Sequence, residues 1–436
     1  MATVTVTDLL TRWRAIRQAG GVSAFIDAEL KRRGFIVQRS ATAQMSKAEL
    51  ARYKKALKDE AAEKRKIARE AWAAYKAAHI VHLGDGVFFN DQSDFDRYDL
   101  PEPEARANEN ELPKLDNPQA LADALGLTLP ELRWMAYHRD LATKLHYRRF
   151  TIPKKSGGER AIWAPLPKLK AAQRWIHREI VEHLPVHGAA HGFLPGRSIF
   201  TNAKAHTASQ LVVGLDLADF FPTVTWRRVK GVFRHAGYRE QVATLLALIC
   251  TEAPREIIQS DGQTLFAALG PRCLPQGAPT SPALTNTLCL RLDRRLSGLA
   301  TKLGWRYTRY ADDLTFSLPA ALGPKSNAEA RIGTLIGSVE RIAIDEGFAV
   351  NRDKTRVLRP GDRQQVTGLV VNGDAAPRVP RDLRRTLRAA IHNLEQGKPL
   401  RPDETLAKLT GYAAFVHLAD PEEGRALLDR LRALDR

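Results

Sequence analysis

The chain has 436 residues, 44% of them hydrophobic, and a formal net charge of +18. A single hydrophobic core rarely organises so long a chain, so we expect two or three structural units. The excess of Lys and Arg favours a polyanionic partner, with nucleic acid as the first candidate and an anionic membrane surface as the alternative. No run of roughly 18 apolar residues could span a bilayer, and Asp8 and Arg12 stand where a signal peptide would be apolar. We therefore expect a cytoplasmic protein without a membrane partner.

Residues 1–83 are predicted to form a helical N-terminal extension. Apolar periodicity indicates a helical segment that begins after Thr7 and continues through Ser23 to Arg33, where Gly34 ends it, and a longer helix over Ser46–His79. The long helix is rich in Ala, Lys, Arg and Glu and only thinly apolar, so we expect it to lie along the surface. We interpret its charged face as solvated, with contact to RNA as the alternative.

Residues 84–116 are dominated by Gly, Asp, Asn, Glu and Pro, which predicts an acidic linker or loop and the main domain boundary. Beyond it, two short helices are expected around Gly126, within residues 121–135. Such a pair also opens helix-turn-helix DNA-binding motifs. Because it runs directly into a strand-like segment, we expect it to pack against its own domain, and specific DNA recognition is the alternative.

The strongest local signal is the segment Arg306–Leu318, in which two β-rich runs flank Ala311, Asp312 and Asp313. This pattern predicts a hairpin whose turn presents two carboxylates. Pairs of aspartates are also common in solvated turns, so the turn by itself does not establish a metal site.

A further acidic position lies upstream, in the segment Leu211–Val224, where Asp216 and Asp219 interrupt a buried-strand pattern. An acid inside an apolar strand is costly unless it is paired or bound to a metal. If this strand lies beside the hairpin, their acids would supply oxygen ligands for two Mg²⁺ ions about 4 Å apart, as in phosphoryl transfer. Nucleases and phosphatases use the same arrangement, so the pattern alone does not distinguish synthesis from cleavage.

The residues around these acids resemble the palm of reverse transcriptases. The YxDD motif of that family is matched by Tyr310–Asp313, and Asp216 falls at the position of its first catalytic aspartate. The resemblance implies that Asp216, Asp312 and Asp313 hold two Mg²⁺ ions and catalyse RNA-directed DNA synthesis. It also places Phe221 where a bulky ring excludes the ribose 2′-hydroxyl and so favours deoxynucleotides. Plain core packing of Phe221 is the alternative.

Two more segments resemble nucleotide-binding motifs of the same family. In residues 274–286, the resemblance implies that Gln276 and the Gly277 backbone approach the incoming nucleotide. In residues 347–358, it implies that Lys354 lies near the pyrophosphate and acts as a general acid. Taken without the resemblance, Lys354 would be interpreted as an ordinary surface lysine.

Residues 152–165 resemble the fingers hairpin of the family, with a tight turn at Ser156–Gly158. The resemblance implies that Lys155 and Arg160, on either side of this turn, clamp the triphosphate of a dNTP. Lys154 is the competing candidate for the role given to Lys155.

Two short motifs narrow the resemblance to retron reverse transcriptases. NAKAH fits their NAxxH pattern and VTGLVVN fits their VTG pattern, and they occur before the first catalytic strand and after the palm. The matching residues are Asn202, Ala203 and His206 in the first motif and Val366, Thr367 and Gly368 in the second. The resemblance covers residues 117–420, whereas the preceding part of the chain matches no motif of the family.

The retron resemblance implies that the enzyme copies a structured non-coding RNA, starting from a guanosine 2′-hydroxyl, into a branched RNA–DNA hybrid. It further implies an anti-phage role in which enzyme and product restrain a separately encoded toxic effector protein. Another prokaryotic reverse transcriptase, of the diversity-generating or abortive-infection type, is the nearest alternative. A non-catalytic basic nucleic-acid-binding protein is the alternative from a different class.

The resemblance also implies an α+β right-hand polymerase fold, with fingers and palm over residues 117–375 and a helical thumb over residues 376–436. The thumb segment has arginines at helical spacing, which suits contact with the backbone of an RNA-containing duplex and also occurs on plain solvated helices. These arginines are Arg381, Arg384, Arg385 and Arg388.

Overall fold

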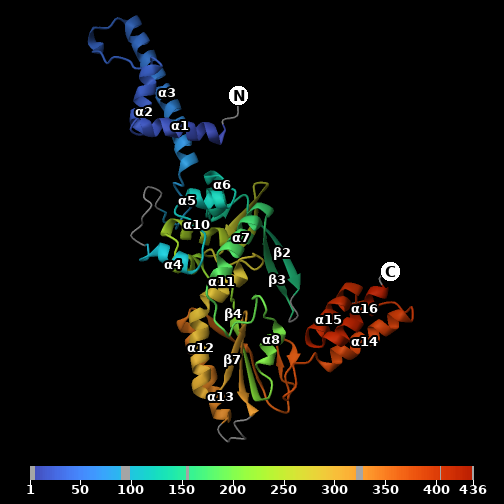
Figure 1. Ribbon diagram of the computed structural model, residues 1–436. Coiled ribbons are helices and arrows are strands. Elements are labelled where there is room, and N and C mark those ends of the chain that lie inside the picture. Colours follow the sequence, from blue (N-terminus) through green and yellow to red (C-terminus); the bar gives the residue numbers. More distant parts are fainter. Residues whose placement is uncertain (1–4, 90–98, 154–156, 321–327, 403, 435–436) are drawn as a thin grey trace.

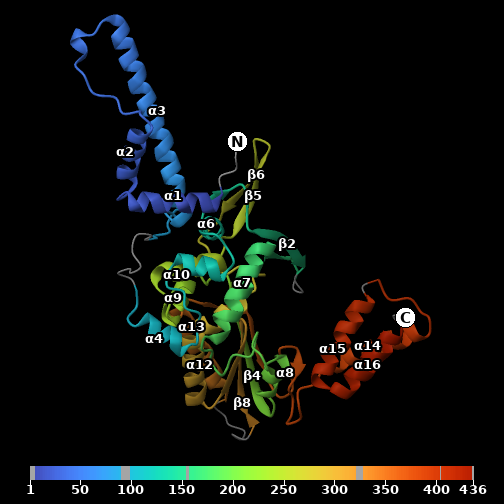
Figure 2. The ribbon, with the colours of Figure 1, turned by 45° about the horizontal axis from the view of Figure 1, so that its top comes forward.

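The computed structural model describes residues 5–89, 99–153, 157–320, 328–402 and 404–434. They form a projecting N-terminal helical arm, a central body built around an antiparallel sheet, and a C-terminal helical unit (Figure 1). Figure 2 shows that the arm and the C-terminal unit lie on different sides of the body. The mixture of helices and antiparallel sheets confirms the α+β class.

The N-terminal arm is helical, as predicted, but Gly20 and Gly21 divide its first predicted helical segment into two helices. Its helices are α1 (Val6–Gln18), α2 (Val22–Arg32) and α3 (Lys47–Ala78), and a short 3₁₀ turn, η1 (Thr42–Gln44), precedes α3. Thr5 and Ser46 begin α1 and α3 with capping boxes, which satisfy the free N–H groups of the first turn. The apolar faces of α1 and α2 pack on α3 around Ala71 and Ile67. The arm therefore has small cores of its own.

In the segment expected to be an acidic linker or loop, residues 84–116, the described stretch that follows residue 98 packs against the body. It contains α4 (Pro103–Glu109), which contacts α9 (Trp226–Ala236). Leu112 and Leu115 that follow are buried in the main core. The stretch after α4 is thus anchored by apolar contacts, and the domain boundary placed in this segment remains a proposal.

The predicted helix pair around Gly126 consists of α5 (Pro118–Ala124) and α6 (Leu129–Ala136). Leu121 and Leu132 are fully buried in the main core. The apolar faces of both helices are therefore turned into the body, as expected for a pair that packs within its own domain.

The central sheet has the strand order β7-β8-β4-β9, and every neighbouring pair is antiparallel. Its strands are β4 (Ser209–Ala218), β7 (Arg306–Tyr310), β8 (Asp313–Pro319) and β9 (Ala349–Leu358). Along β4, Leu211, Val213, Leu215 and Leu217 belong to the main core. Because successive side chains of a strand point to opposite faces, Asp216 shares the other face with Val212.

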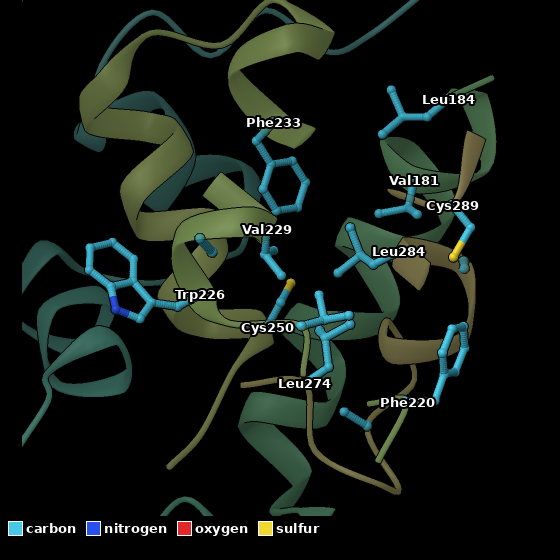
Figure 3. Packing of buried hydrophobic residues seen from close by; sticks show 14 of the residues in the cluster. Val181, Leu184, Phe220, Trp226, Val229, Phe233, Cys250, Leu274, Leu284 and Cys289 are labelled. Carbon is cyan, nitrogen blue, oxygen red and sulfur yellow. The ribbon is translucent and has the colours of Figure 1, made fainter. Parts of the chain in front are cut away.

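Helices α12 (Leu290–Leu303) and α13 (Ala328–Asp345) contact each other and the sheet (Figure 1). The main core continues beyond the sheet, and Figure 3 shows side chains from several helices coming together there. The other helices of the body are α7 (Pro167–Glu179), η2 (Val181–His183), α8 (Ile199–Lys204), α10 (Glu240–Cys250) and α11 (Ser281–Leu288).

Three smaller groups of strands surround the central sheet. β2 (Tyr147–Pro153) and β3 (Glu159–Pro165) form a hairpin. A three-stranded sheet has the order β1-β6-β5 and comprises β1 (Leu141–Ala142), β5 (Arg255–Ser260) and β6 (Gln263–Ala268). β10 (Gln365–Val366) and β11 (Leu369–Val370) pair around a tight turn that precedes the C-terminal helices.

The C-terminal unit consists of α14 (Arg381–Glu395), α15 (Leu406–Ala419) and α16 (Pro421–Leu434). Its core includes Leu387, Val416 and Leu427, and this cluster continues through Leu369 to Val212 on the sheet. The unit is therefore joined to the sheet face that carries Asp216. In the part of the chain that the structure describes, every helix is too short or too polar to cross a lipid bilayer.

Candidate active site

The three predicted catalytic aspartates lie together at one end of the central sheet. β7 and β8 pair through Tyr310 and Asp313, which leaves Ala311 and Asp312 as a two-residue turn. Asp216, near the end of β4, is the register partner of Asp313. Antiparallel pairing thus joins acids that are far apart in the sequence.

The backbone of the turn is held from two sides. Ala311 has φ 56°, a left-handed conformation that is uncommon for residues other than glycine. The Leu217 amide donates a hydrogen bond to the carbonyl oxygen of Asp312 at 3.0 Å. Gly192 packs against the turn, where a Cβ atom would come within 2.9 Å of the Ala311 nitrogen. These contacts fix the main chain from which the two aspartates project.

Burial and mutual repulsion raise the pKa values of the acids in the turn. Burial, followed by the charges of Asp312 and Asp216, raises the pKa of Asp313 to about 6. The pKa of Asp312 is also raised, chiefly by burial, while Lys354 and Arg160 partly oppose this shift. Carboxylates that resist ionisation side by side form a cluster that a cation would stabilise.

Lys354 is directed at these acids by an irregularity in β9. Where β4 advances by two residues, from Gly214 to Asp216, its partner β9 advances by five. Extra residues of this kind form a bulge, which changes the direction of the side chains. The Lys354 ammonium donates to Asp216 Oδ1 at 2.9 Å, and this hydrogen bond raises the pKa of Lys354.

The aspartates supply the oxygen ligands that a divalent cation prefers. Among the described residues, no three His, Cys, Asp or Glu side chains converge as a ready-made metal site. The charges of Asp312 and Asp216 repel that of Asp313, and Lys354 donates a hydrogen bond to one oxygen of Asp216. A bound cation would remove that repulsion and replace the Lys354 contact. The donor set therefore fits a divalent ion once these side chains reorient.

A groove of about 690 Å³ runs along the sheet face that carries Asp216. Its lining includes Asp216, Asp313 and Lys354 from the acidic end of the sheet, Arg356 from β9, and the VTG turn at Val366–Gly368. Arginine along the wall suits a phosphate backbone. The groove can therefore hold a nucleic acid strand whose reacting end meets the aspartates.

The two motifs that narrowed the family meet in one buried hydrogen-bond chain. Asn202 and His206 are fully buried. His206 Nδ1 lies 2.8 Å from Ser317 Oγ, and its Nε2 lies 2.7 Å from Thr308 Oγ1. The Thr308 hydroxyl donates to Asn202 Oδ1 at 2.6 Å, and Asn202 donates to Thr367 Oγ1 at 3.5 Å. The chain links α8 to both strands of the catalytic hairpin and to the VTG turn.

A single neutral form of His206 satisfies this chain. Because Thr308 gives its proton to Asn202, it accepts from Nε2–H of His206, which leaves Nδ1 to accept from Ser317. Burial lowers the pKa of His206 to about 3, so the ring stays neutral. These residues thus hold the VTG turn in place from within the fold.

The apolar members of the two motifs have a structural role as well. Ala203 and Val366 are buried in the core cluster that joins the C-terminal unit to the sheet. Thr367 and Gly368 have φ values of 46° and 87°, which form the tight turn between β10 and β11. The NAxxH side chains therefore support the groove, and the VTG residues line it.

An ion pair that the sequence analysis missed lies under the catalytic turn. Arg309 of β7 and Asp293 of α12 are fully buried and joined by hydrogen bonds of 2.7 and 2.8 Å. Arg309 also donates to the Ala311 carbonyl oxygen and to Asn286 Oδ1, each at 3.1 Å. The available signal was an arginine inside the predicted strand that leads directly into the turn.

Phe220 and Phe221 occupy different environments. Phe220 is 3% exposed and packs in the main core, whereas Phe221 is half-buried and meets Phe220 edge-on, with ring centroids 5.6 Å apart. Core packing therefore accounts for Phe220, and Phe221 keeps a partly open ring just after the strand that bears Asp216.

The loop with Gln276 and Gly277 packs against the β2–β3 hairpin. The Gln276 carbonyl accepts from the Trp163 amide at 2.7 Å. Gly277 has φ 124°, and a Cβ atom there would lie 2.8 Å from the Trp163 carbonyl oxygen, so only glycine fits. Arg160, on β3, is exposed and its charge acts on Asp312. Lys155 lies outside the described residues.

The C-terminal arginines divide into two pairs. Arg384 and Arg388 both form ion pairs with Glu423 of α16, so their charges stabilise the packing of α14 on α16. Arg381 and Arg385 are exposed on α14. Of these four arginines, only Arg381 and Arg385 have no ion pair among the described residues. The expectation that all four contact a nucleic-acid backbone is therefore best supported for these two.

Comparison with known proteins agrees with this geometry. The family model described as reverse transcriptase (RNA-dependent DNA polymerase) matches residues 152–376. The Retron Mx162 reverse transcriptase of Myxococcus xanthus is 52% identical over 433 residues, covering 98% of this chain and 89% of that protein. The Retron Mx65 reverse transcriptase of the same organism is 43% identical, covering 76% of this chain and 75% of that protein. The Retron Ec86 reverse transcriptase of Escherichia coli is 32% identical, with coverages of 74% and 91%.

Proposed function

This chain belongs to the retron reverse transcriptases, and we propose that Asp216, Asp312 and Asp313 perform its DNA synthesis by two-metal phosphoryl transfer. Its activity is RNA-directed DNA polymerisation, with an RNA template and dNTPs as substrates. Family membership sets aside the non-catalytic alternative and the other prokaryotic reverse transcriptases. The observation that supports the assignment of residues is the register pair Asp216–Asp313 beside the turn that presents Asp312.

Reverse transcriptases use divalent metal ions, and the proposed ions are two Mg²⁺ held by the three aspartates. When bound, they would activate the primer hydroxyl and offset the charge that builds on the phosphoryl group and the leaving pyrophosphate. The protein itself would provide deprotonated carboxylates, held at a fixed distance from the primer strand. The backbone contacts of Leu217 and Gly192 with the turn supply that rigidity.

Lys354 is the proposed general acid. Its ammonium donates a hydrogen bond to Asp216 Oδ1, and a cation held by that carboxylate would free it. A lysine side chain is protonated near neutral pH, so Lys354 could then donate a proton to the departing pyrophosphate. The half-buried ring of Phe221 is the proposed steric gate against the ribose 2′-hydroxyl.

The remaining nucleotide contacts are proposed on the β2–β3 hairpin and the loop that packs on it. Arg160 and Lys155 would bind the triphosphate, and Gln276 and the Gly277 backbone would approach the base pair being formed. The hydrogen bond between Gln276 and Trp163 supports this, because it makes the loop and the hairpin one surface next to the aspartates.

The architecture suits a right-hand polymerase. We assign fingers and palm to residues 117–375, with the central sheet as the palm and the β2–β3 hairpin as part of the fingers, and the thumb to residues 376–436. Residues 1–83 are a helical extension and residues 84–116 connect it to the body. The contact of the C-terminal unit with the groove face of the sheet supports the thumb assignment.

The retron family suggests the wider reaction. We propose that the enzyme starts from a guanosine 2′-hydroxyl of its structured non-coding RNA and makes a branched RNA–DNA hybrid. A separately encoded effector protein, restrained by enzyme and product, would complete an anti-phage system. The VTG turn is the proposed contact for the RNA strand that carries the priming guanosine, and its place in the lining of the groove supports this.

The test replaces Asp312 and Asp313 together by Asn. Extension of a primer on RNA with Mg²⁺ should fall by several orders of magnitude, while RNA binding and the thermal stability of the protein are kept, because the change removes charge and little volume. Asp261→Asn with Asp374→Asn is the matched control, since both aspartates are exposed and neither lines the groove. Near-normal synthesis by the double variant would contradict the assignment.

The retron step needs its own readout. Expression of the chain with its native upstream DNA should yield a short DNA whose branched end is cut by debranching enzyme, and the Asp312 and Asp313 variant should yield none. Primer extension without any branched DNA would leave the polymerase in place and overturn the branched-product proposal.

A further inference from the structure

We propose that one face of α3 is a docking surface for a double-stranded stem of the template RNA. The surface, named the cationic stripe, consists of the exposed side chains Lys54, Lys58, Arg65, Arg69, Trp72 and Lys76. The proposal rests on the function proposed above, because it assumes that this enzyme selects one structured RNA. It assigns a partner to the part of the chain that matches no motif of the family.

One face of α3 carries cations and no acid. At about 100° per residue, all members of the cationic stripe lie within roughly 60° of one another around the helix axis. The helix positions between them, such as Ala61 and Ala62, add no negative charge. The acids of the same stretch lie on average about 150° away. These acids are Asp59, Glu60, Glu63 and Glu70.

Three of these four acids form ion pairs with arginines of the arm. The pairs are Glu60–Arg39 at 2.7 Å, Glu63–Arg33 at 2.6 Å and Glu70–Arg12 at 3.1 Å. Within the described part of the chain, the cations of the stripe form no ion pair with an acid. Residues 1–83 contain 17 Lys and Arg against 8 Asp and Glu, so their net charge is +9, half of the +18 of the whole chain. The stripe contributes five of these cations, all of them exposed on α3.

Trp72 adds an aromatic surface to the stripe. Its side chain is 49% exposed. The indole lies parallel to the Tyr75 ring, with centroids 5.4 Å apart, and Tyr75 in turn stacks on His79 at 4.2 Å. This stack holds the indole in one orientation at low entropic cost, so its exposed part can receive an unpaired base at the end of a stem.

The dimensions and chemistry of the stripe favour an RNA duplex over other partners. Its members span about 33 Å along a straight helix, which matches a rigid backbone better than a flexible strand. RNA helices are recognised through shape and phosphates, which exposed Lys and Arg contact without reading sequence. Protein interfaces are depleted of Lys and centred on apolar side chains, and the stripe has the opposite composition. RNA is also favoured over the DNA product as the partner, because the template RNA must be bound before any DNA is made.

The test compares two full-length variants that lose the same charge from the same helix. Arg65→Gln with Arg69→Gln removes two cations of the stripe, whereas Arg52→Gln with Lys64→Gln removes two exposed cations on other faces. The probe is the RNA transcribed from the DNA next to the gene. The stripe variant should bind it about tenfold more weakly near physiological salt, and the slope of log affinity against log salt should fall by roughly 1.5 to 2. The control should bind like the parent protein.

A companion variant, Trp72→Ala, should weaken binding of the same RNA with an unchanged salt slope, because it removes stacking and no charge. Circular dichroism checks that α3 is intact in each variant. Extension of a short primer on a generic RNA template should be unaffected in all of them. Loss of that extension in the parent protein would be a failure of the proposed function and not of the docking surface.

Equal weakening by the stripe and control variants would overturn the proposal, because charge in general would then explain it. Unchanged RNA binding by the stripe variant would overturn it too and would leave a protein partner as the occupant. Selective loss of binding to single-stranded DNA product, with RNA binding intact, would likewise overturn the assignment to RNA.

Discussion

The turn that presents Asp312 and Asp313 differs from the polar cluster beneath it in how far its charges are paired. In the turn, Asp312 and Asp313 are crowded acids with raised pKa values. Beneath the turn, Arg309 and Asp293 are fully buried and satisfy each other with charge-assisted hydrogen bonds. The charges of the turn are therefore only partly compensated, by Lys354 and Arg160, whereas the charges beneath it are fully paired. Variants that act on each group of charges test this difference, and the largest expected effect comes first.

Breaking the buried ion pair should have the largest effect on stability. Arg309→Met leaves Asp293 buried without its partner, which we expect to cost about 3 to 5 kcal/mol in the free energy of unfolding. Adding Asp293→Leu removes the orphaned charge and should recover most of that stability. DNA synthesis should stay low in the double variant, because the hydrogen bond to the Ala311 carbonyl is still missing. Urea unfolding and primer extension measure the two properties.

Recovery of both stability and synthesis in that double variant would show that Arg309 serves the fold alone. Loss of stability without recovery would show instead that the apolar pair does not fit between β7 and α12. The expected result is the dissociation of the two properties.

Lys354→Met should lower kcat by about 10²-fold, the usual range for loss of a general acid, with a smaller change in KM. Arg352→Met is the control, because Arg352 lies in the same bulged segment but pairs with Glu340. Single-turnover nucleotide addition measures the chemical step. A change in KM alone would show that Lys354 binds the substrate and is not the general acid.

Phe221→Ala should relax discrimination against ribonucleotides by roughly 10- to 100-fold, because the half-buried ring no longer fills the space next to the sugar. Phe220→Leu should lower stability without relaxing discrimination, since Phe220 packs in the core. Competition between dNTPs and NTPs gives the ratio. Equal discrimination by the parent protein and the Phe221 variant would show that this ring serves only core packing.

The buried histidine predicts a smaller, pH-dependent effect. Folding lowers the pKa of His206 from 6.5 to about 3, so below pH 6.5 the unfolded chain binds a proton that the folded chain does not. Stability is therefore full above that pH and is lost as the pH falls, by about 1.4 kcal/mol per pH unit for this residue. His206→Gln should make the stability curve shallower between pH 6.5 and 4, while parent and variant stay parallel above pH 7. Parallel curves throughout would contradict the neutral, buried state.

Local sequence patterns predicted the structure wherever the conformation of a segment depends on its own residues. The N-terminal helices follow from periodicity and capping residues such as Ser46, and the catalytic hairpin follows from two β-rich runs around a turn. The family motifs located the aspartates and the VTG turn. They did not explain the NAxxH residues, whose partners Thr308 and Ser317 lie on strands about a hundred residues later.

By itself, the sequence determined the elements and the chemical identity of the acids, because helix and strand periodicity and turn propensity act over a few neighbouring residues. The tertiary structure alone decided which charges are paired. The bulge in β9 turned Lys354 toward Asp216, and strand packing on α12 buried Arg309 against Asp293. It also placed Glu423 between two arginines that were expected to face nucleic acid. Such pairings depend on strand register and helix packing, which bring together residues whose separation along the chain carries no local signal.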